Sequence, residues 1–277
     1  MWIDSHCHLD AAEFGGDALE VAAAAQRAGV SAIVIPAVHP DNFEVVAALA
    51  RERSDCFYAL GIHPMYVPHA EESDLQLLRK AVAAALADPA LHPRFVAIGE
   101  IGLDFFIPEL AASPLREKQE FFYAEQLKLA RDFDLPVLLH VRRSQDIILK
   151  YLRRIQPAGG IAHAFNGSEQ QAQTFIDLGF KLGFGGAMTY TRALQIRRLA
   201  QSLPPGSHRT GNRCTRHLAQ LAAPGGQQSS AIAAHRRCAG GIARPALGAG
   251  GAANYAQCAA SVAAHASLEL ISRLFMR

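Results

Sequence analysis

The chain has 277 residues, of which 50% are apolar and 19% charged, so it can bury a large core, and disordered, coiled-coil and collagen-like proteins are excluded. No apolar run approaches the roughly 20 residues of a membrane span, and the first residues show no export signal, so we expect a cytoplasmic protein with no membrane partner. The net charge of +2 is unevenly distributed, because residues 206–277 hold eight Arg and one acidic residue, whereas acidic residues are in excess in residues 1–205.

Short apolar segments alternate with helical segments along residues 1–205. Strands are predicted at residues 2–6, 32–37, 57–62, 96–99, 136–140, 161–164 and 181–184. Helical periodicity is present at residues 17–28, 75–87, 115–133, 144–154 and 168–178. This alternation predicts parallel strands, and the strand count favours a TIM-like (β/α)8 barrel over a doubly wound sheet. An eighth strand should follow Leu203, but the sequence shows none, so we predict that it is lost in the tail.

Histidine and glutamate residues stand at the ends of the predicted strands, where a barrel keeps its active site. His6 and His8 are two residues apart, which places both imidazoles on one face of an extended segment. Glu100 follows a buried apolar run between two glycines, and a buried carboxylate needs a cation or strong donors. His140 and His163 close two later strands. Each residue alone has a plain structural alternative, a strand-end histidine or an ion pair, but together they predict a divalent metal centre.

Three further residues are candidate substrate contacts. Arg142 and Arg143 come directly after His140, and a guanidinium beside a divalent metal suits phosphate oxygens. The alternative is a solvated pair of charges at the start of a helix. His63 ends the third predicted strand in the segment GIHP and could face the same site, or could be a structural residue with satisfied hydrogen bonds.

Six sequence motifs resemble those of a known family. In chain order they are IDSHCHLD, GIHP, GEIGLDFF, EKQEFFYAEQLKLARDFDLPVLLHVRRSQD, HAFNGS and KLGFGGAMTYTRA. Over residues 1–205 the chain resembles the TatD family of metal-dependent deoxyribonucleases, and the last motif resembles its YjjV-like branch. The resemblance implies a TIM-like barrel that hydrolyses phosphodiester bonds in DNA with a metal-activated water.

The resemblance also implies roles for particular residues. His6 and His8 match the first-strand ligands, Glu100 the bridging catalytic carboxylate, and His140 and His163 the remaining histidine ligands. We therefore expect two divalent cations per subunit, Zn, Mg or Mn, with DNA as substrate and a monomeric protein. The sixth element of the family pattern, an aspartate in a T-D-A-P motif on the eighth strand, is absent from residues 206–277.

The tail has the signature of a shifted reading frame. Its 72 residues hold 18 Ala, no Lys and no Asp, and the composition changes where the resemblance stops. Read from the second nucleotide of each codon, residues 206–217 with the first base of Leu218 can encode DRIVLETDAPDI, which contains the missing motif. We therefore predict a hydrolase barrel with strands 1 to 7 in residues 1–205 and a frameshifted, poorly structured tail in residues 206–277.

Two alternative functions stay open. Related barrels with the same histidine pattern hydrolyse C–N or carboxylic ester bonds, as amidohydrolases do, so a different bond is one alternative. The other is that the chain as written is an inactive metal-binding product of a frameshifted gene, because one catalytic carboxylate is missing.

Overall fold

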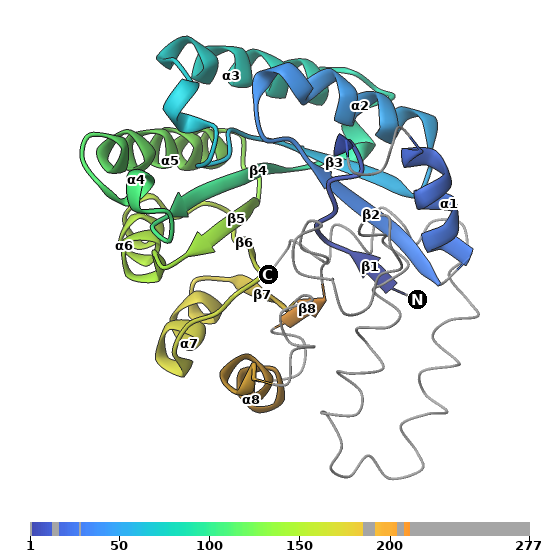
Figure 1. The fold of residues 1–277 in the computed structure, drawn as a ribbon. Coiled ribbons are helices and arrows are strands. Elements are labelled where there is room, and N and C mark those ends of the chain that lie inside the picture. Colours follow the sequence, from blue (N-terminus) through green and yellow to red (C-terminus); the bar gives the residue numbers. More distant parts are fainter. Residues whose placement is uncertain (1, 13–16, 28, 185–191, 204–207, 211–277) are drawn as a thin grey trace, which may run out of the picture.

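Eight parallel strands form one curled sheet in the computed structural model of the chain (Figure 1). The structure describes residues 2–12, 17–27, 29–184, 192–203 and 208–210. The strands are β1 (Trp2–Asp4), β2 (Val30–Pro36), β3 (Cys56–Leu60), β4 (Phe95–Asp104), β5 (Val137–Arg142), β6 (Gly160–His163), β7 (Phe180–Phe184) and β8 (His208–Thr210). Each strand pairs with the next one in sequence. The parallel TIM-like architecture and the seven predicted strands are therefore confirmed.

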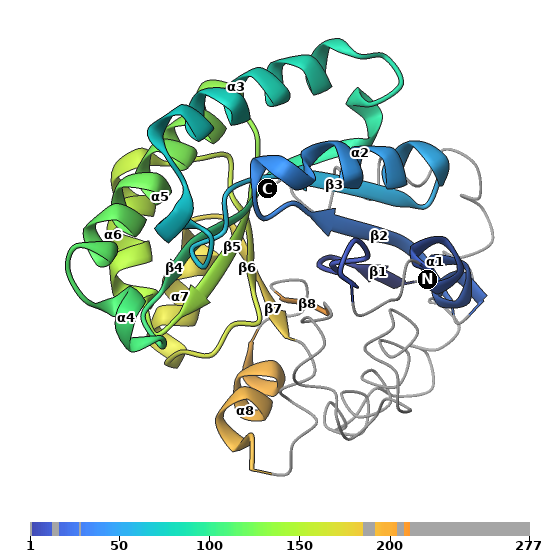
Figure 2. The ribbon, with the colours of Figure 1, turned by 45° about the horizontal axis from the view of Figure 1, so that its top comes forward.

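Helices connect the strands and lie on the outer side of the curled sheet (Figure 2). They are α1 (Ala18–Arg27), α2 (Phe43–Glu52), α3 (Glu72–Ala87), α4 (Pro108–Ala111), α5 (Leu115–Asp132), α6 (Gln145–Ile155), α7 (Glu169–Asp177) and α8 (Leu194–Ser202). The five helical segments predicted from periodicity are confirmed, and α2, α4 and α8 were not predicted. In the part of the chain that the structure describes, no helix combines the length and the apolar character needed to cross a bilayer.

Side chains along the strands alternate between two apolar clusters, as the two-residue period of a strand requires. The smaller cluster consists of Ala32, Val34, Phe57, Ala59, Ala97, Leu138 and Ile161. Their sequence neighbours, such as Ile33 and Leu139, belong to the larger cluster, which includes buried side chains of the helices. The smaller cluster therefore lines the inside of the curled sheet. His140 and His163 continue this inner face, because they stand two residues beyond Leu138 and Ile161.

Strand β4 departs from regular alternation at Glu100. Ile98 is paired with Val137 and Ile101 with Leu139, so β4 has one more residue than β5 between these two pairs. Such a bulge re-aims the side chains that follow it. Regular alternation from Ala97 would turn residue 99 inward, whereas the extra residue turns Glu100 inward. The strand continues to Asp104, so Glu100 lies inside it and not at its end, which corrects the predicted strand end at residue 99.

Residues beyond 207 are described only at His208–Thr210. There the sequence showed no strand, yet the three residues form β8, with Leu182 paired with His208 and Phe184 with Thr210. Backbone pairing needs no particular side chains, so a polar segment can form such a strand. Within the described residues, β1 and β8 are the two edges of the sheet, and β8 carries no carboxylate. The rest of the predicted tail, residues 211–277, lies outside the described residues, so the division at residue 205 stays a prediction.

Candidate metal centre

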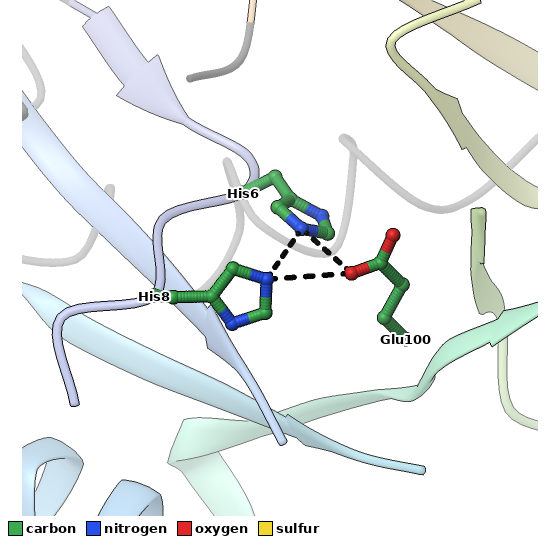
Figure 3. A group of neighbouring side chains, drawn as sticks. All are labelled: His6, His8 and Glu100. Carbon is green, nitrogen blue, oxygen red and sulfur yellow. Dashed lines mark hydrogen bonds and ion pairs between the residues drawn. The ribbon is translucent and has the colours of Figure 1, made fainter. Parts of the chain in front are cut away.

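Glu100 and two histidines after β1 form a first triangle of donor atoms (Figure 3). The Nε2 atoms of His6 and His8 are 3.2 Å apart. Oε2 of Glu100 lies 3.0 Å from Nε2 of His6 and 3.4 Å from Nε2 of His8. The segment carrying the histidines is held by Asp4, whose Oδ1 accepts the backbone N–H of His6 at 3.1 Å.

The other carboxylate oxygen of Glu100 belongs to a second triangle, with His63 and His140. Oε1 lies 3.0 Å from Nδ1 of His140 and 3.5 Å from Nε2 of His63. The two imidazole nitrogens are 3.1 Å apart. His63 is brought here by the segment after β3, where its backbone N–H donates to the carbonyl of Val38 at 2.9 Å. One carboxylate therefore stands between two groups of histidines.

The spacing of these donor atoms fits divalent metal ions. Adjacent ligands around an ion with bonds of about 2.1 Å are separated by about 3.0 Å in octahedral and about 3.4 Å in tetrahedral geometry. The edges of both triangles lie close to this range, from 3.0 to 3.5 Å. Imidazole nitrogen together with carboxylate oxygen is a donor set that zinc and other divalent metals take in proteins.

Burial sets the charges in this cluster. Desolvation lowers the pKa of His6, and it lowers the pKa of His63 to about 4, so both imidazoles are neutral at pH 7. Burial alone would raise the pKa of Glu100, but the surrounding histidines hold it well below its usual range. Burial would also lower the pKa of His8, yet its hydrogen bond to Glu100 and the charge of that residue raise it. A buried carboxylate beside the neutral imidazoles of His6 and His63 favours a cation.

The remaining predicted ligand, His163, lies beside the triangles. Its ring stacks on that of His6, with centroids 3.7 Å apart and an interplanar angle of 11°. Its Nε2 atom is 4.0 Å from Oε1 of Glu100, the longest of the distances from a histidine nitrogen to this carboxylate. The structure thus brings all five predicted ligands together and adds His63, which the sequence indicated only as a substrate contact.

The two predicted arginines both lie near the aromatic ring of Phe106. The guanidinium carbon of Arg142 lies 3.8 Å from the ring centroid of Phe106, and that of Arg143 lies 4.8 Å from it. Phe106 is 46% exposed. The backbone φ of Arg143 is +55°. Residues other than glycine rarely adopt this left-handed conformation, and those that do are often found at functional positions. These residues form a cationic surface beside the metal centre.

Asp104 joins this surface to the metal centre. Its Oδ2 atom lies 3.1 Å from Nε2 of His140 and 3.5 Å from a guanidinium nitrogen of Arg142. Burial alone would raise the pKa of this carboxyl, but hydrogen bonds from His140 and the backbone of Phe106, with the charge of Arg142, lower it to about 2. Sequence reasoning missed Asp104 and Phe106. The signal for Asp104 was available, because it stands four residues beyond Glu100 and therefore on the same face of an extended strand.

Comparison with known proteins gives the family. A family model described as TatD related DNase matches residues 3–207. An uncharacterized metal-dependent hydrolase of Escherichia coli K12, YjjV, is 41% identical over 207 residues, which cover 74% of this chain and 76% of that protein. The crystal structure of a YjjV protein from E. coli K12, called a TatD homologue, has a TM-score of 0.82 and 32% identity, over 99% of this chain and 97% of that one.

A more distant relative carries a named activity. A protein of Klebsiella pneumoniae named 3'-5' ssDNA/RNA exonuclease TatD is 31% identical over 207 residues, which cover 73% of each chain. The family match, the relatives and the barrel with its cluster of histidines around Glu100 agree with one another. The chain belongs to the TatD family of metal-dependent hydrolases, on its YjjV-like branch.

Proposed function

We propose that this protein hydrolyses phosphodiester bonds of DNA with two divalent cations held by the centre around Glu100. The observation that carries the proposal is the geometry of Glu100, whose two oxygens each belong to a different triangle of donor atoms. Paired divalent ions bridged by a carboxylate are typical of enzymes that cleave phosphate esters. The name of the Klebsiella relative supports a nucleic acid substrate.

Different residues of this chain would hold the ions and bind the phosphate. His6 and His8 with Oε2 of Glu100 would hold one ion, and Nδ1 of His140 with Oε1 of Glu100 would hold the other, with His163 next to both. Bound divalent ions supply Lewis-acid polarisation of a phosphoryl oxygen and lower the pKa of water. Arg142 and Arg143 would bind the non-bridging phosphate oxygens, since a guanidinium matches them with two donors and stabilises the charge that develops there.

The first test compares chelated and metal-loaded protein on an end-labelled single-stranded oligonucleotide. EDTA should abolish hydrolysis, and added Mn²⁺ or Zn²⁺ should restore it. Glu100→Gln should lower kcat/KM by at least about 100-fold, because both ions lose a charged ligand. Arg142→Gln should act mainly on KM, since it binds the phosphate.

A matched control is Asp55→Asn. Asp55 is also a buried carboxylate, paired with Arg53 at 2.7 Å, but it precedes β3 at the opposite end of the strand from His63, so this variant should keep its activity per folded molecule. Activity unaffected by EDTA would refute the proposal. Hydrolysis of small amides or lactones without hydrolysis of DNA would support the C–N or ester hydrolase. A folded protein that binds ions and hydrolyses none of these substrates would be an inactive product.

A further inference from the structure

The proton on the His63 ring can be placed from its hydrogen-bond partner. The backbone N–H of Met65 donates to Nδ1 of His63 at 3.1 Å. A backbone N–H can only donate, so Nδ1 must accept with its lone pair. In a neutral imidazole the single ring proton is then on Nε2. The nitrogen of His63 that faces Glu100 and His140 therefore carries a hydrogen atom.

The proton on His140 can be placed in the same way. Its Nε2 atom lies 3.1 Å from Oδ2 of Asp104, and an ionised carboxylate only accepts hydrogen bonds. Asp104 is fully buried, and its Oδ1 atom accepts the backbone N–H of Phe106 at 2.9 Å. Arg142 approaches the same carboxylate with a further donor. The other groups around Asp104 donate to it, so Nε2 of His140 carries a proton. Nδ1 of His140 faces the Nε2–H group of His63 at 3.1 Å, so Nδ1 accepts and carries the lone pair.

These two assignments are consistent, because they produce one directional chain of hydrogen bonds. Met65 donates to His63, Nε2 of His63 donates to Nδ1 of His140 at 3.1 Å, and His140 donates to Asp104. In the second triangle, Nδ1 of His140 and Oε1 of Glu100 are then two acceptors only 3.0 Å apart. Two acceptors in contact repel each other unless a donor or a cation lies beside both. Nε2–H of His63 does so here, 3.1 Å from one and 3.5 Å from the other. A cation bound by Nδ1 of His140 and Oε1 of Glu100 would replace it, because a nitrogen that carries a proton cannot itself bind an ion.

We propose that His63 is not a metal ligand but a hydrogen-bond donor at the reaction centre, and that Asp104 is a positioning residue that presents Nδ1 of His140 to the ion. With the lone pair of His140 directed at an ion, the Nε2–H group of His63 would keep only Oε1 of Glu100, at 3.5 Å, as a nearby acceptor and would be available to donate to the substrate. On the proposed function, on which this last step rests, its acceptor is a non-bridging oxygen of the phosphate. The second ion is then held without His63, although His63 lies as close to Glu100 as a ligand would.

The first experiment reads the protons directly. Nitrogen-15 NMR of the full chain, labelled at histidine and freed of metal with EDTA, distinguishes protonated from unprotonated ring nitrogens. His63→Gln and His140→Gln identify the two sets of signals by their disappearance. We expect the proton on Nε2 in both residues. A proton on Nδ1 of His63 would overturn the proposal, whether or not the protein cleaves DNA.

The second experiment measures Mn²⁺ and Zn²⁺ binding by calorimetry. His63→Ala should change the affinity of each ion by less than about threefold, whereas His140→Ala should remove one ion. Asp104→Asn should weaken that same ion by about 10- to 100-fold, because an amide N–H facing His140 inverts its tautomer. Asp104→Glu, which keeps the charge, should recover part of the affinity and covers the case in which Asp104→Asn fails to fold. Asp55→Asn is the control for loss of a buried carboxylate.

The ion affinity of His63→Ala decides whether His63 is a ligand. If His63→Ala loses an ion as His140→Ala does, His63 is a ligand and the proposal is wrong. If the affinity is kept, activity on DNA should still fall in His63→Ala, mainly in kcat, and should partly return in His63→Gln, whose amide can donate. Failure of every variant and of the unmodified chain to cleave a phosphodiester would refute the proposed function but leave the proton assignment and the ion affinities intact.

Discussion

A histidine in this site takes its role from the group that contacts its second ring nitrogen. His63 and His140 both face Glu100, yet a backbone N–H holds one and a carboxylate holds the other. The first partner leaves a proton facing the site, and the second leaves a lone pair. Residue type alone cannot separate these cases. The sequence therefore indicated which side chains meet, but the partners decide what each one does.

The lowered pKa of His63 predicts a pH dependence of stability in metal-free protein. Its pKa is about 4 in the folded state, chiefly because of burial, and 6.5 when unfolded. Between these two pH values the unfolded chain binds more protons than the folded one. The contribution of neutral His63 to the free energy of unfolding is therefore fully present above pH 6.5 and is lost as the pH falls toward 4. The difference of 2.5 units corresponds to about 3 kcal/mol.

Urea unfolding in EDTA at several pH values between 7 and 4 measures this effect. Relative to the unmodified chain, His63→Gln should lose less stability as the pH falls, with the two curves converging by about 3 kcal/mol. The control for removal of a histidine is His69→Gln, at an exposed position of the same connection. Parallel curves for His63→Gln would contradict the prediction.

At the scale of elements, the sequence predicted what depends on local pattern and missed what depends on pairing between strands. The inner residues of β5 and β6 follow simple alternation, so His140 and His163 could be placed on the inner face from apolar runs alone. His163 ends β6 as predicted, whereas β5 continues beyond the predicted end at His140 to Arg142. The run before Glu100 looked complete at residue 99, because two glycines interrupt the apolar pattern. The bulge against β5 and the continuation to Asp104 exist only in the register between two strands. Asp104 was missed because the strand was ended at residue 99, although the two-residue period counted from Glu100 places Asp104 on the same face.

Gly99 shows why that bulge is specific to this sequence. A Cβ atom at this position would lie 2.6 Å from Cβ of Leu138 and 2.8 Å from its carbonyl oxygen, so β4 and β5 could not stay this close. Gly99→Ala should destabilise the protein by about 1–3 kcal/mol, as overpacking of a core does, and should also move Glu100. Loss of ion affinity in the molecules that remain folded is the second expected result.

Val96→Ala separates these two effects. Val96 lies on the same strand, before the bulge, and packs against the inner apolar cluster, which contains none of the donor residues of the two triangles. It should lose stability through reduced packing and keep its ion affinity. Thermal unfolding and calorimetric titration on both variants provide the measurements. Unchanged ion affinity in Gly99→Ala would show that the bulge does not position Glu100.

At the scale of the whole molecule, the last strand of the sheet departs most from the apolar pattern of a parallel barrel. The family match ends at residue 207, and the alignments with the two relatives described above each extend over 207 residues. β8 follows with three polar residues, where a strand of a parallel barrel is normally apolar because helices cover one face and the core the other. Read one nucleotide later, the same three codons can encode Ile, Val and Leu. We propose that residues 206–277 are the product of a shifted frame.

Sequencing the coding DNA across the codons for residues 199–214 tests the proposal. A single inserted or missing nucleotide is expected, and correcting it should give an apolar eighth strand followed by an aspartate, which supplies a further carboxylate at the carboxyl end of the barrel where ligands gather. The corrected protein should bind divalent ions more tightly than the 277-residue chain and cleave DNA faster, because a carboxylate adds charge to the centre. If the reported frame is confirmed and the 277-residue chain is fully active, the barrel works without that carboxylate, and the donors around Glu100 are sufficient for catalysis.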